Sequence, residues 1–314
     1  INVPIGIFSL IVIPLTVNDT AKDKNSGKVD VLGLVFLITW LFSMQVVLDK
    51  GQQYGWFDCT WICWLSVFSL GCMFLFVVWE LEIKEPIVNL RVFKDLNFVV
   101  GTILGVLVNV MVCVTIILLP QYYQGLMHYT ASLTGLALAS RVVACVALFF
   151  IGKLCQMYDL RALIATGFVF IGVSISLCAN LNLQSSPTAI ILSNVLFGIG
   201  SVFALVPISS LALGTLPKSK IPDAAGVHSL SKCVTGSMFT SLASSFAISL
   251  SQVHQTYLLK NMTVYNPVFV KHFTVLKGAF MHSLPSLSAA RKANAILYKQ
   301  LLVQAKLSAF ADLF

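Results

Sequence analysis

The feature that most constrains this chain is a series of apolar runs of about 20 residues, the length that a helix needs to cross roughly 30 Å of hydrocarbon. Hydrophobic residues make up 58% of the 314 positions and charged residues 10%. An ordinary water-soluble domain has fewer of the first and more of the second. The sequence therefore predicts an all-α polytopic membrane protein.

The positions of the runs predict the organisation of the chain. Seven full spans with short loops are expected within 31–250. Their apolar runs lie at about 31–49, 61–80, 98–119, 133–151, 162–180, 189–211 and 226–250. At the ends we expect the tail of a span at 1–17, a cytoplasmic loop at 18–30, a long periplasmic loop with a helical end at 251–306, and the start of a final span at 307–314. Both ends are therefore expected to be cuts, with an N-terminal half missing.

The basic residues predict the orientation, because short loops rich in Lys and Arg stay in the cytoplasm. Every second loop is basic, and the loops at 51–60, 121–130 and 181–188 contain no Lys or Arg. The basic loops carry Lys22, Lys24, Lys28, Lys84, Arg91, Lys94, Lys153, Arg161, Lys218 and Lys220. The net charge of +8 is thus spread over short loops. The lipid bilayer, and not nucleic acid, is the expected partner.

Polar side chains inside the spans are the candidate site residues. Arg141 lies in the middle of a span, and Lys232 lies about two turns into the last complete one. A charge at this depth costs at least about 2.5 kcal/mol, so each is a functional hypothesis. The alternatives are a structural pairing of Arg141 with a neighbouring helix and snorkelling of Lys232 to the interface. The uncharged candidates are Gln45, Asn109 and Asn194 at depth, with Gln121 and Tyr122 at an outer mouth.

The acidic residues of the spans, Asp49, Glu80 and Glu82, lie at span edges. A proton-coupled carrier needs a buried carboxylate or histidine, so the main proton site is expected outside this chain. His254, His272 and His282 lack metal-ligand spacing. The sequence contains no phosphate-binding loop, HExxH motif or nucleophile elbow. We therefore expect no enzyme activity, catalytic residue, cofactor or metal.

Short motifs along the chain carry a family resemblance. They occur at 1–6, 30–33, 47–52, 55–57, 85–93, 119–124, 135–138 and 304–312. In this order they resemble the C-terminal portion of the EmrB/QacA-type fourteen-span drug:proton antiporters of the major facilitator superfamily. The resemblance implies a partial major-facilitator-type helical bundle in the bacterial inner membrane. It also implies alternating access, exchange of protons for small hydrophobic substrates and, in Gram-negative members, a periplasmic adaptor and an outer-membrane channel.

Two departures from the family pattern affect the predicted sites. Gly152, Asp159 and Arg161 match the family's gating loop, but Gln156 and Met157 stand where the family usually has an Asp–Arg pair. Gates of this kind work by making and breaking ion pairs between helix ends. Lys232 stands where the family typically has Arg, which removes the planar fork of the guanidinium.

The leading hypothesis is therefore proton-coupled export of hydrophobic drugs or other toxic small molecules. Its substrates would occupy a broad apolar cavity lined partly by Gln45, Asn109, Arg141 and Asn194. The alternative is a truncated, transport-incompetent remnant, or an assembly-only half, of such a transporter. A channel or receptor without coupled transport is a third possibility.

Overall fold

The computed structural model describes residues 2–16, 30–83, 86–182, 184–281 and 285–314. Every regular element within these ranges is an α-helix or a short 3₁₀ helix. Seven segments in these ranges are long and apolar enough to cross a membrane. They are Val31–Tyr54, Thr60–Glu82, Leu96–Gly125, Ala131–Met157, Leu160–Ala179, Pro187–Gly214 and Ile221–Leu259. The predicted all-α polytopic fold class is confirmed.

The α-helices are α1 (Asn2–Thr16), α2 (Val31–Gly51), α3 (Thr60–Glu82), α4 (Leu96–Gly125), α5 (Ala131–Ala139), α6 (Ala144–Met157), α7 (Leu160–Ala179), α8 (Pro187–Gly214), α9 (Ile221–Leu259), α10 (Pro267–Met281) and α11 (Ser286–Leu313). The 3₁₀ helices are η1 (Gln52–Tyr54), η2 (Trp56–Asp58), η3 (Leu90–Lys94), η4 (Ser140–Val143) and η5 (Lys218–Lys220). Because η4 interrupts the apolar run at 133–151, the span predicted there consists of three elements.

Side-chain caps explain where several helices begin. An oxygen of Asp30, Asp95, Thr130, Asp159 or Ser186 accepts a hydrogen bond from the first turn of the helix that follows, which satisfies amides that have no partner within the helix. Asp95 accepts from the amides of Asn97 and Phe98 at 2.8 and 3.2 Å. These bonds, chiefly that from Phe98, lower the pKa of the Asp95 carboxyl.

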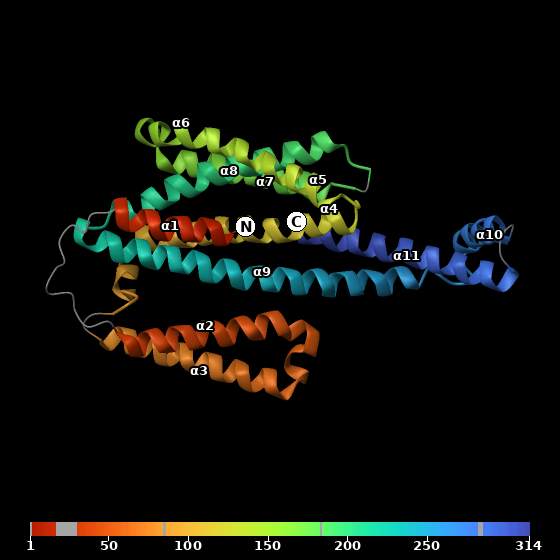
Figure 1. Ribbon diagram of the computed structural model, residues 1–314, viewed down its shortest axis with the longest axis horizontal. Helices are drawn as coiled ribbons and strands as arrows, with labels where there is room; N and C mark the ends of the chain where they lie inside the picture. Colours follow the sequence, from red (N-terminus) through yellow and green to blue (C-terminus); the bar gives the residue numbers. More distant parts are fainter. Residues whose placement is uncertain (1, 17–29, 84–85, 183, 282–284) are drawn as a thin grey trace.

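Helices α4 to α8 form a closely packed bundle, with α7 lying along α8 and α4 beside α8 (Figure 1). An apolar cluster that includes Val108, Ile171 and Phe197 fills the space between these three helices. Close backbone contact requires glycine in α7, since a Cβ on Gly167 would lie 2.7 Å from the Ala204 nitrogen of α8. Small residues promote such helix contacts in membranes, where lipid is as apolar as the side chains.

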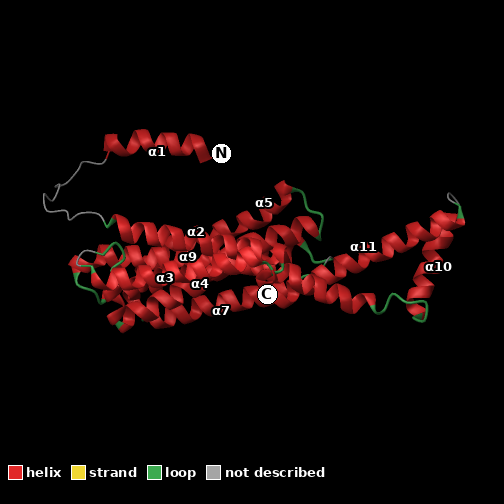
Figure 2. Cartoon of the chain, turned by 90° about the horizontal axis from the view of Figure 1, so that it is seen from below, coloured by secondary structure: helices red, strands yellow, loops and turns green. Residues whose placement is uncertain are grey.

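Helices α2 and α3 form a separate hairpin that contacts the rest of the molecule mainly through α9 (Figure 1). At one end of the hairpin Leu37 and Phe76 belong to an apolar cluster with Val88 and with Val227 of α9. In Figure 2, α1 lies apart from all of these helices, and its Leu10 and Leu15 side chains are exposed.

The C-terminal helices extend beyond the others. Helix α9 continues as one helix to Leu259, past the apolar run that ends near residue 250. Helix α10 and the first turns of α11 lie beyond the ends of α4 to α8, and α11 then returns beside α9 (Figures 1 and 2). We call α10 and the beginning of α11 the C-terminal arm. Its placement in the periplasm, and the final span from residue 307, stay predictions.

The connections alternate between the two ends of the bundle. Those between α3 and α4, α6 and α7, and α8 and α9 lie at one end, and those after α2, α4 and α7 lie at the other (Figure 1). The first group contains the basic residues Arg91, Lys94, Lys153, Arg161, Lys218 and Lys220. The remaining residues of the predicted cytoplasmic set, Lys22, Lys24, Lys28 and Lys84, lie outside the described residues.

Candidate functional site

Arg141 lies in η4, where the span switches from α-helix to a 3₁₀ turn and back. A 3₁₀ stretch inside a helix often marks a hinge. The turn packs closely on α8, because a Cβ added to Gly198 would lie 2.7 Å from the Arg141 carbonyl oxygen. The backbone of Arg141 is thus held against α8 by a position that has no room for a side chain.

The Arg141 guanidinium has only neutral partners. Its Nε donates to Asn194 Oδ1 at 2.9 Å, and its Nη1 donates to Thr115 Oγ1 at 3.2 Å. The guanidinium carbon also lies 4.5 Å from the centre of the Phe197 ring, within cation–π distance. Among the described residues, the only side-chain ion pair is that of His254 with Asp312. Arg141 is therefore held by dipoles, and its charge has no countercharge there.

Asn194 extends this set of contacts to α4. Its side chain is 1% exposed, and its Nδ2 donates to the Tyr123 hydroxyl at 3.1 Å and to the Ile190 carbonyl at 2.9 Å. The Tyr123 ring is fully buried and stacks on Tyr129. We call Thr115, Tyr123, Arg141 and Asn194 the Arg141 network. Satisfied polar groups in a low-dielectric interior fix one arrangement of helices, so the network joins α4, η4 and α8 rigidly.

Gln45 takes part in a different contact, between α2 and α9. Its Nε2 donates to Ser241 Oγ at 2.8 Å and to Asp49 Oδ1 at 3.1 Å, and its Oε1 accepts from Ser237 at 2.7 Å. Ser241 also donates to Asp49. A cavity of about 410 Å³ opens beside these residues. We call it the Asp49 cavity.

Asn109 and Lys232 meet at a third place, between α4 and α9. Asn109 Nδ2 donates to the Lys232 carbonyl oxygen at 2.8 Å, and this approach depends on Gly236, where a Cβ would lie 2.7 Å from the same amide nitrogen. The Lys232 side chain is half-buried. Within the part of the chain that the structure describes, its ammonium has no carboxylate partner. The contact therefore uses the backbone of Lys232 and leaves its charge free.

His228, one turn before Lys232, was missed by the sequence analysis, which considered only the histidines of 251–306. It is 3% exposed, and its Nδ1 lies 3.2 Å from the Thr102 hydroxyl. Its Nε2 is buried and has no hydrogen-bond partner among the residues that the structure describes. The signal that could have found it is the one used for Arg141, an ionisable residue inside a predicted span.

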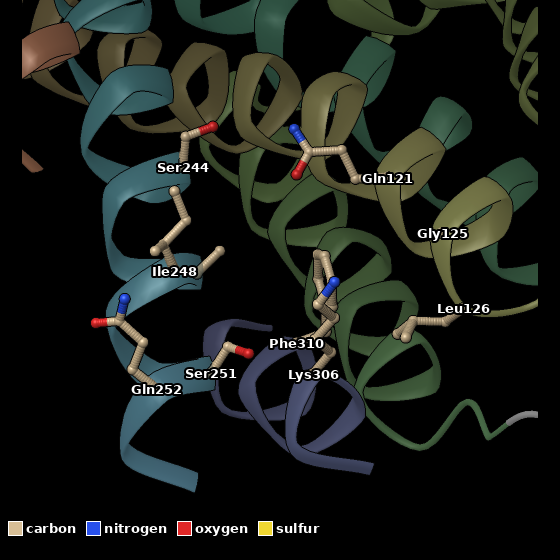
Figure 3. Close-up of a pocket in the computed structure, with 10 residues that line it drawn as sticks. Gln121, Gly125, Leu126, Ser244, Ile248, Ser251, Gln252, Lys306 and Phe310 are labelled. Carbon is tan, nitrogen blue, oxygen red and sulfur yellow. The ribbon is translucent and has the colours of Figure 1, made fainter. Parts of the chain in front are cut away.

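Gln121 and Tyr122 are neighbours in sequence but lie in different surroundings. Gln121 borders a cavity of about 350 Å³ between α4, α9 and α11 (Figure 3). The other lining residues are Gly125, Leu126, Ser244, Ala247, Ile248, Ser251, Gln252, Lys306 and Phe310. Tyr122 is buried and packs edge to face on Phe310, with ring centres 5.7 Å apart. Within the described part of the chain, its hydroxyl has no hydrogen-bond partner. Of the two mouth candidates, only Gln121 is in a position to meet a ligand in this cavity.

The residues predicted for a gating loop lie at the end of the bundle where the basic connections gather. Gly152 is in α6, and a Cβ there would meet nothing within 4 Å. Asp159 caps α7 by accepting from the Arg161 amide at 3.1 Å. Asp159 and Arg161 are exposed and form no ion pair within the described ranges. Their gating role stays a prediction.

The four residues expected to line one cavity are thus distributed over three helix contacts. Arg141 and Asn194 meet each other between η4 and α8, Asn109 meets α9, and Gln45 joins α2 to α9. The physical reason is that the position of a residue within an apolar run determines its depth in the membrane. The direction in which its side chain points depends on the rotation of the helix against its neighbours.

The chain is similar in sequence to several bacterial export and resistance proteins. It is 27% identical over 287 residues to the multidrug export protein EmrB of Escherichia coli (strain K12), a match that covers 90% of this chain and 55% of the relative. It is 27% identical to EmrB of Haemophilus influenzae over 271 residues, covering 85% and 53%. It is 28% identical to the fatty acid resistance protein FarB of Neisseria gonorrhoeae over 269 residues, covering 85% and 53%.

The chain spans about half the length of the curated relatives it matches. No protein-family model matches it.

Proposed function

The chain is a homologue of the EmrB-type multidrug export proteins, and on this premise we propose that it forms part of a transporter that exports hydrophobic drugs or other toxic small molecules across the inner membrane. The observation that carries the proposal is the similarity to two EmrB proteins along 85% and 90% of the chain. It is supported by the seven long apolar helices, which make the chain a multi-pass membrane protein.

Alternating access is the proposed mechanism, and the Arg141 network is the element of this chain proposed to take part in it. A charged side chain inside the membrane is costly unless it faces a cavity or polar partners. Here the neutral partners come from α4 and α8, and the backbone under Arg141 is a 3₁₀ turn. We propose that the transport cycle changes this turn and breaks the bonds to Thr115 and Asn194 together, so that the arrangement fixed by the network is one of two that the cycle needs.

Coupling to protons is a further part of the proposal. Exchange requires a group that gains a proton on one side of the membrane and loses it on the other. We keep the sequence-based prediction that the main coupling group lies in a part of the protein other than this chain. Within the chain, His228 and Asp49 are titratable groups that lie at helix contacts.

We also propose the C-terminal arm as the docking surface for a periplasmic adaptor, through which an outer-membrane channel would be reached. The arm extends beyond the bundle in both views (Figures 1 and 2). Residues 251–311 contain no Asp or Glu, and several apolar side chains of the region, including Val264, Tyr265 and Leu287, are exposed. A basic surface with exposed apolar groups fits an acidic partner that also offers apolar contacts.

The test of transport is uncoupler-sensitive dye efflux from cells that express the complete reading frame, beside cells that express residues 1–314 alone, at matched membrane levels. Efflux that the uncoupler abolishes is the expected result for the complete frame. No efflux from either, across several dyes, would favour the alternative of a transport-incompetent protein.

The test of the network is Arg141→Ala in the complete protein. Loss of a membrane charge that a transport step uses should reduce efflux by about tenfold or more, which corresponds to about 1.4 kcal/mol. Arg91→Ala is the matched control, because Arg91 is an exposed cation whose side chain, among the described residues, donates to the Leu81 carbonyl alone, at 3.4 Å. Unchanged efflux of Arg141→Ala at equal expression would exclude Arg141 from the transport step.

A further inference from the structure

The contact between α2 and α9 changes character along its length. At the end near Asp30 it is apolar, with Leu37 and Val227 in one buried cluster. At the other end it is polar. Gln45 and Asp49 of α2 lie one turn apart on one face of the helix, and Gln52, the first residue of η1, follows three residues later. On α9, Ser237, Ser241 and Ser249 lie opposite them.

The polar end carries one negative charge, that of Asp49. Its carboxylate accepts hydrogen bonds from Gln45 and from Ser241, both neutral donors. Lys50, the next residue in the chain, donates instead to Gln53 at 3.2 Å. The side chains that α9 and α4 contribute to the cavity are all uncharged: Thr240, Ser241, Ser244, Ser245, Ile248 and Ile117. Among the described residues, Asp49 therefore has hydrogen bonds but no countercharge.

The position of Asp49 in its helix also disfavours its negative charge. It lies in the last turn of α2, close to the helix end at Gly51. The partial charge at a helix C-terminus is negative, so an anion is unfavourable there and a cation is favourable. The helix dipole therefore gives no reason for a carboxylate at this place. A cation bound beside Asp49 would interact favourably with both the carboxylate and the helix end.

Two cavities follow the contact. The Asp49 cavity has a volume of about 410 Å³, and a neighbouring one of about 480 Å³ shares Gln45 with it. The second is mainly apolar, since Ile38, Leu41, Phe42, Val234 and Met238 line it. Each lies within the range of small-molecule sites, about 300–1,000 Å³. The two cavities meet at Gln45, whose side chain bonds to Ser237 and Ser241; we treat them as one groove, apolar on one side of Gln45 and carrying Asp49 on the other. We call it the α2–α9 groove.

We propose that the α2–α9 groove binds an amphipathic organic cation, whose apolar body lies along Leu41, Phe42 and Met238 and whose charged centre lies beside Asp49. The inference rests on the proposed export function and assigns a ligand class and a residue to it.

Binding of methyltriphenylphosphonium to the purified full-length protein tests the proposal, measured by equilibrium dialysis with triphenylphosphine oxide as an uncharged probe of similar shape. Asp49→Asn should weaken phosphonium binding by about tenfold and leave binding of the uncharged probe unchanged. Asp49→Glu, which keeps the charge, should retain phosphonium binding. Asp58→Asn is the matched control, because Asp58 is an exposed carboxylate in η2, outside the groove residues.

If Asp49→Asn bound the phosphonium as tightly as the wild-type protein does, the proposal would be overturned. Equal weakening by Asp49→Glu and Asp49→Asn would also overturn it, because the charge would then not be what the ligand recognises. Failure of the proposed function has a different signature: the complete wild-type protein exports no dye, whatever the binding measurements give. If substitution of Asp49 leaves phosphonium affinity unchanged while the complete protein shows uncoupler-sensitive efflux, the assignment of the α2–α9 groove is wrong and the proposed export function stands.

Discussion

Arg141 and Asp49 are both charged side chains without an oppositely charged partner among the described residues, yet they lie in contrasting surroundings. Arg141 is enclosed where η4 packs on α8, and three neutral groups surround its guanidinium. Asp49 lies at a looser contact between two helices, beside a cavity of about 410 Å³. The first charge is held by dipoles that the fold has already placed. The second is open to a ligand.

This difference has a consequence for mutational tests. A change near Arg141 disturbs packing and hydrogen bonding together, because interiors of this density transmit small shifts. A change at Asp49 should alter recognition and leave the bundle intact. The two regions share no hydrogen bond within the described ranges, so changes in one should leave the other unaffected. Phosphonium binding at Asp49 can therefore serve as an internal reference for variants of the Arg141 network, because it should be unchanged when only the network is altered.

The largest effect is expected from Asn194→Leu. Leucine has the same branching but removes the acceptor of Arg141 Nε and the donor to Tyr123, so a buried charge loses one of its hydrogen bonds and a buried hydroxyl loses its partner. Unsatisfied buried groups cost about 1–3 kcal/mol each. Chemical unfolding in detergent should show a loss of about 2 kcal/mol or more. Phosphonium binding should not change.

Asn180→Leu is its control, because Asn180 is exposed just after the end of α7 and, among the described residues, its side chain donates only to the Ser176 carbonyl. Equal stability of Asn194→Leu and wild type would show that the network contributes nothing to holding α4, η4 and α8 together.

An intermediate effect is expected from Gly198→Ala. The new methyl group would lie 2.7 Å from the Arg141 carbonyl oxygen and 3.1 Å from Ala144 Cβ, so η4 must move away from α8. Overpacking of this kind costs about 1–3 kcal/mol, and dye efflux should fall with it.

The same substitution at Gly172 of α7 supplies the control, because a Cβ there meets nothing within 4 Å. Alanine at that position should be neutral or slightly stabilising, by up to about 1 kcal/mol, through its helix propensity. If Gly198→Ala and Gly172→Ala had the same free energy of unfolding, the close approach at Gly198 would have no energetic role.

The smallest effect is expected from Tyr123→Phe, which removes one hydroxyl from the Arg141 network and keeps the ring. Its bond with Asn194 should account for about 1 kcal/mol of unfolding free energy. Tyr122→Phe is a closely matched comparison, since the neighbouring hydroxyl is buried without a partner and its removal should cost nothing. A larger loss for Tyr122→Phe than for Tyr123→Phe would contradict the hydrogen-bond assignment of both residues.

The comparison of the two regions also shows which site residues could be predicted from the sequence. Arg141 and Asn194 were both candidates from depth alone, and the structure joins them by a direct hydrogen bond. Tyr123 was passed over in favour of Tyr122, because two adjacent tyrosines in one helix look alike in sequence although they face different neighbours. Asp49 was set aside as an edge residue. Position along the span gave no indication that α9 places three hydroxyls opposite α2.

The sequence by itself determined that this chain is a multi-span helical membrane protein, because the length of an apolar run and the cost of burying charge depend only on local composition. Its short motifs were also enough to place it among the relatives of EmrB. Only the tertiary structure decided which polar residues meet. Contacts such as those of Arg141 with Asn194 and of Asp49 with Ser241 depend on how each helix is rotated and how closely glycines such as Gly198 let it approach its neighbour, and hydropathy carries no record of either.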